Sequence, residues 1–170
     1  MLKEEQLPNG LSIIYKENAI LGPILNRSPE PVQEVNSQSF GFTNSSTLYT
    51  GGASTCAVVI LNTAELWGLF HGVYATKEER DTTPARNEPG LLTLEDFLEF
   101  WRIIKGYKPD RAIVLGANFN PEFRYKVLTL LKSFGLKPGR IVRRWNDHEE
   151  SDIEVVLHPR SSRITQIITV

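Results

Sequence analysis

The chain has 170 residues, of which 41% are hydrophobic, and its 19 basic side chains nearly balance its 20 acidic ones. A chain of this length can bury roughly two-thirds of its unfolded-state surface in one compact unit, so we expect a single domain over residues 1–170. Neither sign of charge gathers into a long run, and one cysteine cannot form an intramolecular disulfide framework, which argues against a nucleic-acid-binding arm, a membrane-binding patch and a disulfide-rich scaffold.

The ends and the apolar stretches of the chain bear on its location. Residues 1–5 lack the basic start and apolar core of a secretory signal. No apolar stretch approaches the roughly 20 residues that cross a bilayer. We therefore expect a soluble protein without a membrane partner, either cytoplasmic or delivered to a host cell by a signal-independent secretion route.

Residues 1–45 form the least regular part of the sequence. The segment Leu11–Tyr15 has the composition of a strand, but prolines interrupt longer elements. These prolines are Pro8, Pro23, Pro29 and Pro31. We expect an irregular N-terminal arm over residues 1–45 and a folded core over residues 46–170.

The core begins with two apolar runs and a polar connection. Ala57–Leu61 is a short, β-branched run typical of a buried strand, and Leu66–Tyr74 is expected to be a second strand. Thr76–Gly90 is rich in charged residues and contains two prolines, which indicates a long exposed loop. Its length makes it a candidate for function.

Two helices and several strands are predicted beyond this loop. Thr93 is an expected N-cap with Asp96 three residues later, and apolar residues recur at helical spacing to about Gly106. A strand over Arg111–Gly116 and a helix from Asn120–Pro121 to Gly135 follow. The tail contains three β-like segments, the last two joined by a turn. These segments are Leu136–Trp145, Asp152–Leu157 and Ile164–Val170, and the turn is His158–Ser162.

The order of these elements is strands, helix, strand, helix, strands. Two helices of this kind cover a sheet face while hairpins extend the sheet. The sequence therefore predicts an α/β (α+β) sandwich with a mixed β-sheet core and two principal helices.

Cys56 stands where a loop of small residues becomes a buried strand. Such a loop lets a substrate approach the backbone and leaves amide N–H groups to face an oxyanion, while the strand holds the thiol. The loop residues of interest are Gly52, Ser54 and Thr55. The alternative interpretation is that Cys56 is a small buried hydrophobic residue.

His71 lies in the next apolar run, and apolar strands rarely contain a histidine that has no specific role. Consecutive strands usually neighbour each other, so Cys56 and His71 can meet. A cysteine needs such a base, because an isolated thiol with a pKa near 8.5 is mostly un-ionised at neutral pH. We predict an approach of about 4 Å between the sulfur and the imidazole. A hydrogen-bonded core histidine is the alternative.

The segment Thr50–Val58, followed by Gly68–His71, resembles the active-site pattern of the chemoreceptor glutamine deamidases, the CheD family. In that family a threonine stands six residues before the cysteine and a glycine three residues before the histidine. Leu115–Asn118, before the second helix, is also similar to the family. The resemblance extends to the cytotoxic necrotizing factor catalytic domain and Burkholderia lethal factor.

The resemblance implies Cys56 as nucleophile, His71 as general base and acid, and Thr50 as the residue that orients the imidazole. It implies a protein substrate carrying a target glutamine and no cofactor. The chain departs from the family pattern at Ser54-Thr55-Cys56, at Gly72-Val73 and over Trp145–Glu150. These departures favour a target other than a chemoreceptor. We expect two segments around the site to bind this target protein, Thr76–Gly90 and Trp145–Glu150.

Other interpretations remain open at this point. His148 and His158 with nearby acidic residues have no metal-site spacing, so no metal is expected. If an amine replaced water, the same site would act as a transglutaminase. A non-catalytic protein-binding module that keeps the fold is the alternative function, since a fold does not fix a function.

Overall fold

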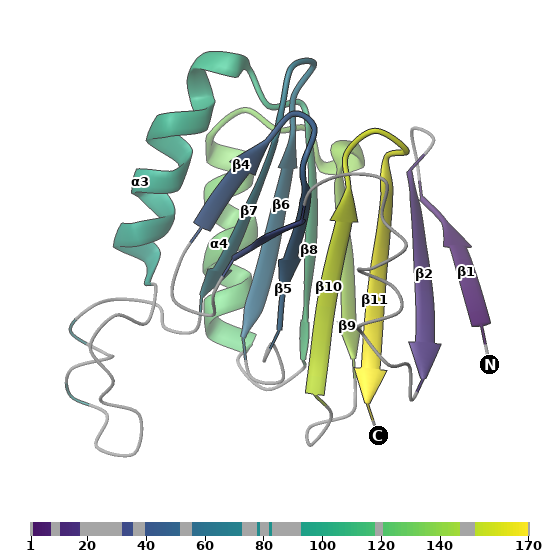
Figure 1. The fold of residues 1–170 in the computed structure, drawn as a ribbon. Helices are drawn as coiled ribbons and strands as arrows, with labels where there is room; N and C mark the ends of the chain where they lie inside the picture. The colour runs from purple at the N-terminus through teal and green to yellow at the C-terminus, as the bar shows by residue number, and fades with distance from the viewer. Residues whose placement is uncertain are drawn as a thin grey trace.

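The computed structural model of the chain contains two β-sheets and two principal helices (Figure 1). The structure describes residues 2–7, 11–17, 32–35, 40–51, 56–72, 78, 82, 93–117, 121–146 and 152–169.

Both sheets are mixed. The six-stranded sheet has the order β1 (Leu2–Gln6), β2 (Ser12–Glu17), β11 (Arg163–Thr169), β10 (Asp152–His158), β5 (Thr47–Thr50) and β3 (Val32–Glu34). The five-stranded sheet has the order β4 (Phe40–Thr43), β7 (Trp67–Gly72), β6 (Ala57–Asn62), β8 (Arg111–Ala117) and β9 (Ile141–Asn146). The pairs β2–β11, β3–β5 and β8–β9 are parallel, and the others are antiparallel.

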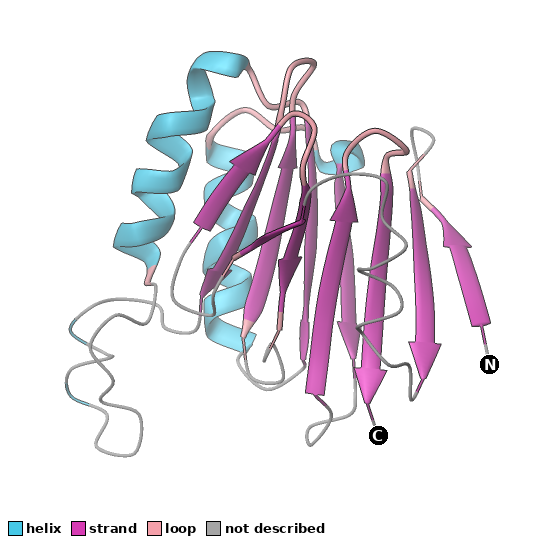
Figure 2. Ribbon diagram, viewed as in Figure 1, coloured by secondary structure: helices cyan, strands magenta, loops and turns pink. Residues whose placement is uncertain are grey.

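The helices α3 (Leu94–Ile104) and α4 (Pro121–Ser133) lie on the outer side of the five-stranded sheet (Figure 2). Short 3₁₀ turns follow them, η3 (Lys105–Tyr107) and η4 (Pro138–Arg140). The molecule is thus layered as helices, sheet and sheet. The predicted α+β sandwich with a mixed sheet and two principal helices is confirmed, but the strands divide between two sheets.

Alternation along β6 divides the apolar residues into two cores. Val58 and Ile60 face the six-stranded sheet and pack with residues such as Leu48 and Val155. Val59, which lies between them, points to the other face of the sheet. It packs against the helices, as do the residues two positions before and after it in the strand. A strand that is buried on both faces needs the continuous apolar run seen in the sequence.

Local sequence signals account for the ends of both helices. Thr93 forms a capping box with Asp96, as predicted, and the backbone N–H of Thr93 donates to the Asp96 carboxylate at 2.8 Å. Gly135, with φ of 93°, ends α4 in a Schellman motif: its N–H donates to the Lys132 carbonyl, and the N–H of Leu136 donates to the Leu131 carbonyl. Leu131 and Leu136 belong to the same core cluster.

Two expectations differ from the structure. Residues 1–45 contain β1, β2, β3 and β4 rather than an irregular arm. In the sequence, the four prolines fall outside the residue ranges of these strands. The expected strand over Leu136–Trp145 begins only at Ile141, because Pro138 opens a 3₁₀ turn.

Candidate active site

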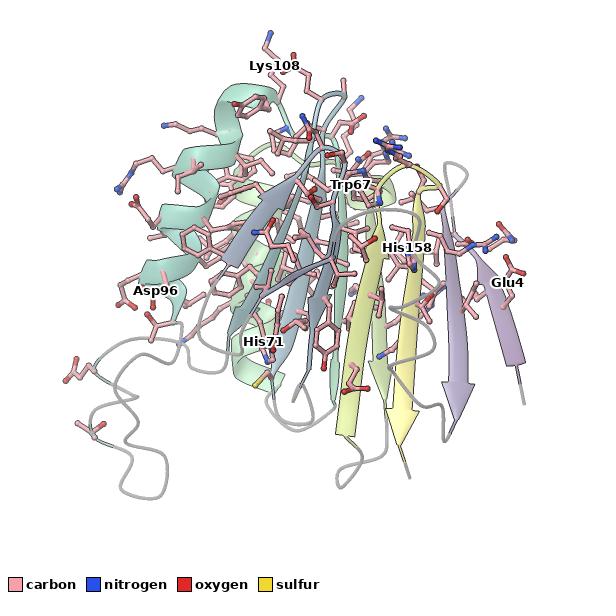
Figure 3. The ribbon with its side chains drawn as sticks, viewed as in Figure 1. Glu4, Trp67, His71, Asp96, Lys108 and His158 are labelled. Carbon is pink, nitrogen blue, oxygen red and sulfur yellow. The ribbon has the colours of Figure 1, made fainter. Side chains whose placement is uncertain are left out.

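The three residues singled out as a catalytic set lie at one end of the strands. Thr50 is the last residue of β5, Cys56 directly precedes β6, and His71 is the penultimate residue of β7. The antiparallel register places the start of β6 beside the end of β7, with Ala57 opposite Gly72. Figure 3 shows His71 near the lower end of the sheets, whereas Trp67, at the other end of β7, lies towards the top.

A hydrogen bond between Thr50 and His71 joins the two sheets. The Thr50 Oγ1 and His71 Nδ1 atoms are 2.8 Å apart, and both residues are fully buried. His71 shares its sheet face with Trp67 and Leu69, which belong to the inter-sheet core. The alternation of the strand therefore turns the imidazole towards β5.

Burial controls the protonation of His71. Desolvation lowers the pKa of His71 from 6.5 to about 4, so the imidazole is neutral at neutral pH. The second ring nitrogen, Nε2, is buried and has no hydrogen-bond partner within the described part of the chain. If Nδ1 carries the proton and donates it to Thr50, Nε2 presents a lone pair. The imidazole is thus neutral, with Nδ1 held by Thr50 and with Nε2 unpartnered among the described residues.

Cys56 lies just before β6, at the end of the sheet that also holds His71. It stands two residues before Val58, which is directly opposite His71 in the antiparallel register. Residues in this diagonal relation have Cα atoms about 7–8 Å apart, within reach of a long or aromatic side chain. Cys56 is 7% exposed, and its thiol is not in a disulfide.

No hydrogen bond joins Cys56 to Nε2 of His71. Since Nε2 has no partner among the described residues, the Cys56 sulfur does not hydrogen-bond to it. Catalytic hydrogen bonds are often long before a substrate binds, so the geometry is compatible with a base that engages the thiol later. The approach to about 4 Å, and the catalytic roles of all three residues, stay predictions.

The remaining predicted site residues are not placed. Gly52, Ser54 and Thr55 lie outside the described residues, as does most of Thr76–Gly90. Of the segment Trp145–Glu150, the structure describes only the backbone of the first two residues. These two residues end β9, where the strand pairs with Ala117 of β8. That end of β8 also pairs with the start of β6, so β9 ends on the side of Cys56.

Two polar features near this end were missed in the sequence. Tyr49 donates a hydrogen bond to Glu154 Oε1 at 2.9 Å, on the opposite face of β5 from Thr50. Gln166 is fully buried, and both its amide atoms lack a hydrogen-bond partner in the described segments. Gln166 shares the inward parity of Ile164, so alternation within the predicted strand was a signal for its burial.

A depression elsewhere in the described structure is separate from the predicted site residues. An open depression of about 470 Å³ lies at the opposite end of the strands, lined by residues that include Phe42, Ser46, Glu65 and Tyr107. It contains none of the predicted site residues. Among the described residues, no three metal-ligating side chains gather, and no helix is long and apolar enough to span a membrane.

Comparisons with known proteins find structural similarity of low extent. No protein family matches the sequence, and no curated protein matches it significantly. The chain is similar to the C-terminal domain of CNFy from Yersinia pseudotuberculosis, with 9% identity and a TM-score of 0.30. The match covers 87% of this chain and 52% of that one, so the chain spans about half the length of the structure it matches. A TM-score and an identity this low do not establish a shared function.

Proposed function

We propose that this chain is a cysteine-dependent amidohydrolase that converts glutamine side chains of a partner protein to glutamate. The observation that carries the proposal is the buried Thr50–His71 hydrogen bond, 2.8 Å long, which leaves Nε2 of a neutral imidazole without a partner among the described residues. Cys56 directly precedes β6, which pairs with the strand that carries His71. The resemblance of the Thr50–Val58 segment to glutamine deamidases supports the same assignment.

In the proposed first step, the Cys56 sulfur attacks the carboxamide carbon as His71 Nε2 accepts the thiol proton. The carbonyl oxygen becomes an oxyanion that backbone N–H groups of the segment before Cys56 stabilise. When the carbon–nitrogen bond breaks, the imidazolium returns this proton to the departing nitrogen. Ammonia leaves, and a thioester joins Cys56 to the substrate.

Water completes the reaction in the second step. His71 accepts a proton from water as the oxygen attacks the thioester carbon, and the carbon–sulfur bond then breaks. The proton returns to the Cys56 sulfur. The net change consumes one amide and one water and yields one carboxylic acid and one ammonia. Thr50 keeps the imidazole oriented through both steps.

The low pKa of His71 determines when the proton moves in this mechanism. With a pKa of about 4, the imidazole does not hold a proton at neutral pH, so the proposed base is neutral at rest. Proton transfer then accompanies attack rather than preceding it.

The proposed substrate is an intact protein. The described residues of the site, Thr50, Cys56 and His71, carry no fixed charge at neutral pH to grip the ammonium and carboxylate groups of free glutamine. Recognition then depends on a wider surface, and contacts remote from the amide also orient it for attack. A short peptide should consequently lose turnover as well as affinity.

The test is site-resolved mass spectrometry of glutamine-to-glutamate conversion. Folded bacterial and eukaryotic lysates are incubated with the wild-type protein or with Cys56→Ser, and a converted protein is compared with its own peptide and with free glutamine. We expect conversion by wild type alone, at least about ten times faster on the intact protein than on its peptide. The Cys56→Ser variant should lose less than about 1.5 kcal/mol of unfolding free energy.

Each alternative has its own signature in this experiment. Conversion by Cys56→Ser at the wild-type rate would refute the nucleophile. Efficient turnover of free glutamine without preference for protein would indicate a metabolic glutaminase. Glutamine cross-linked to added amine would indicate a transglutaminase, and no conversion at all would favour the non-catalytic binding module.

A further inference from the structure

The end of the sandwich opposite the candidate active site carries mostly basic side chains. Four connections meet there, which join β6 to β7, α3 to β8, α4 to β9 and β10 to β11. Together with the first residues of β8 and β11, the described residues of these connections include seven basic and two acidic side chains. This group is called the basic end. Five of its basic side chains are exposed: Lys105, Lys108, Lys137, Arg160 and Arg163.

Strand register places these residues at one end of both sheets. Arg111 is paired with Asn62, the last residue of β6, so it lies at the end of the sheet away from Cys56. Arg140 directly precedes β9, which runs parallel to β8. In the other sheet, Arg163 begins β11 beside the last residue of β10, away from the level at which Thr50 pairs. Figure 3 shows the same arrangement, with Lys108 at the top of the molecule and His71 near the bottom.

The basic end differs sharply in charge from the rest of the chain. Seven basic and two acidic side chains give it a formal charge of +5. The whole chain has 19 basic and 20 acidic side chains, so 12 basic and 18 acidic ones belong to the remainder, whose formal charge is −6. The basic residues come from separate connections, and for this reason no run of charge marks them in the sequence.

The two acidic side chains leave most of this charge uncompensated. The Asp110 carboxylate lies between two arginines, 2.7 Å from Arg140 Nη2 and 3.8 Å from Arg111 Nε. Glu65 lines the open depression at this end, which has no basic residue among its lining side chains. The exposed basic side chains therefore surround no described cavity that could enclose a small anion.

Exposed apolar surface lies beside the basic side chains. Ile103, in the last turn of α3, and Tyr107, in the 3₁₀ turn that follows it, are each 45% exposed. Lys105 lies between them in the sequence, and Lys108 follows Tyr107. Basic residues next to an aliphatic and a phenolic side chain are the combination that suits the headgroup region of a membrane.

We infer that the basic end binds the surface of an anionic lipid bilayer. The exposed basic residues come from connections next to the helices and from the β10–β11 turn of the six-stranded sheet, so an extended surface can contact them together. Anionic headgroups attract the basic side chains, and the boundary with the acyl chains takes up Ile103. A nucleic acid backbone would offer the phosphates without an apolar region for this side chain.

This mode of binding would orient the molecule on the bilayer. The six residues of β6 span about 20 Å, so the candidate active site lies farther from the lipid than the screening length of about 8 Å at physiological salt. The negative remainder of the chain is repelled by the same headgroups. The candidate site would then face away from the membrane, whatever reaction it performs, so the inference does not depend on the proposed deamidation.

The experiment is co-sedimentation with vesicles of phosphatidylcholine alone or with about 30% phosphatidylserine, over a range of salt concentrations. It compares wild type with Lys108→Gln, with Ile103→Ser and with a variant that carries glutamine at all five exposed basic positions. The matched control is Lys126→Gln, which removes one lysine charge from the first half of α4. Thermal unfolding of each variant verifies the fold, and binding of duplex DNA and of polyglutamate is measured in parallel.

We expect wild type to bind the vesicles with phosphatidylserine alone, and to bind them more weakly as salt rises. Lys108→Gln should weaken this binding about fivefold, the usual effect of one basic residue at an anionic surface. Ile103→Ser should also weaken it, by about threefold or more, because less apolar surface enters the interface. Lys126→Gln should change it less than about twofold, and the variant with five substitutions should not bind.

Three results would overturn the inference. The first is equal binding of wild type to both kinds of vesicle. The second is a loss of binding in Lys126→Gln as large as that in Lys108→Gln. The third is wild type that ignores the vesicles but binds duplex DNA or polyglutamate through the five basic positions, which would assign the basic end to a nucleic acid or an acidic protein. None of these measurements uses deamidation, so they leave the proposed function to its own test.

Discussion

His71 is a titratable side chain held in an apolar layer, and the free energy of holding it there depends on pH. Its pKa is lowered to about 4 in the folded protein by desolvation, against 6.5 for an ordinary histidine. Between these two values the unfolded chain binds a proton that the folded protein does not. The contribution of His71 to stability is therefore complete above pH 6.5 and is lost as the pH falls towards 4.

This dependence on pH predicts a loss of unfolding free energy in acid that comes from His71 alone. Between pH 7 and pH 4, His71 should cost about 3 kcal/mol of unfolding free energy, from the difference between its two pKa values. Urea unfolding at several pH values, compared between wild type and His71→Gln, isolates this term from the carboxylates that both proteins share. Parallel pH profiles for the two proteins would mean that the histidine is not buried as described.

The site was partly predictable at the level of residues. A histidine in one apolar run and a cysteine opening the preceding run are visible in the sequence, and strand adjacency allows them to meet. Thr50 and His71 are in contact in the structure, while the roles assigned to them stay predictions. The Tyr49–Glu154 bond was not predictable, because 105 residues separate its partners and only the pairing of β5 with β10 brings them together.

Helix α3 packs closely against the five-stranded sheet over Gly68. A Cβ at this position would be 2.8 Å from Phe100 Cε2 and 2.9 Å from Ile104 Cδ1. The Phe100 ring cannot move away easily, because it is surrounded by other aromatic rings. Its ring centroid lies 5.3 Å from that of Phe42, 5.5 Å from that of Phe40 and 5.7 Å from that of Phe70. Glycine at position 68 thus sets how closely α3 approaches the sheet.

Gly68→Ala should therefore lower the unfolding free energy by about 1–3 kcal/mol, the usual cost of overpacking a core. The matched control is Gly139→Ala, where a Cβ meets no atom within 4 Å. Urea unfolding of both variants measures the difference. A Gly68→Ala protein as stable as the control would show that α3 can shift without cost.

Elements with strong local signals were the ones that the sequence predicted well. The capping box at Thr93 and the glycine at 135 fix helix ends by local hydrogen bonds, so they can be read without tertiary information. The strands β1 and β3 have no such signal: they are short, and in the sequence Pro8 comes soon after β1 while Pro31 directly precedes β3. The division into two sheets depends on pairings far apart in sequence, such as β2 with β11, which no local pattern encodes.

The candidate site belongs to the whole molecule, because its parts come from both sheets. Thr50 lies in the six-stranded sheet, and His71 and the strand that follows Cys56 lie in the five-stranded one. An ion pair between Arg144 and Glu5 also connects the sheets, from β9 to β1. The site can form only when the inter-sheet core has formed, so catalytic competence and global folding should be lost together.

The central claim is that His71 activates the Cys56 thiol, and alkylation of Cys56 by iodoacetamide tests it without knowledge of the substrate. The rate is followed by intact mass from about pH 5 to about pH 9 in wild type, His71→Gln and Thr50→Val. We predict that wild-type Cys56 reacts below pH 7 at least about ten times faster than in His71→Gln, with Thr50→Val between them. Equal rates in wild type and His71→Gln, both rising only near the pKa of about 8.5 of an ordinary thiol, would contradict the account.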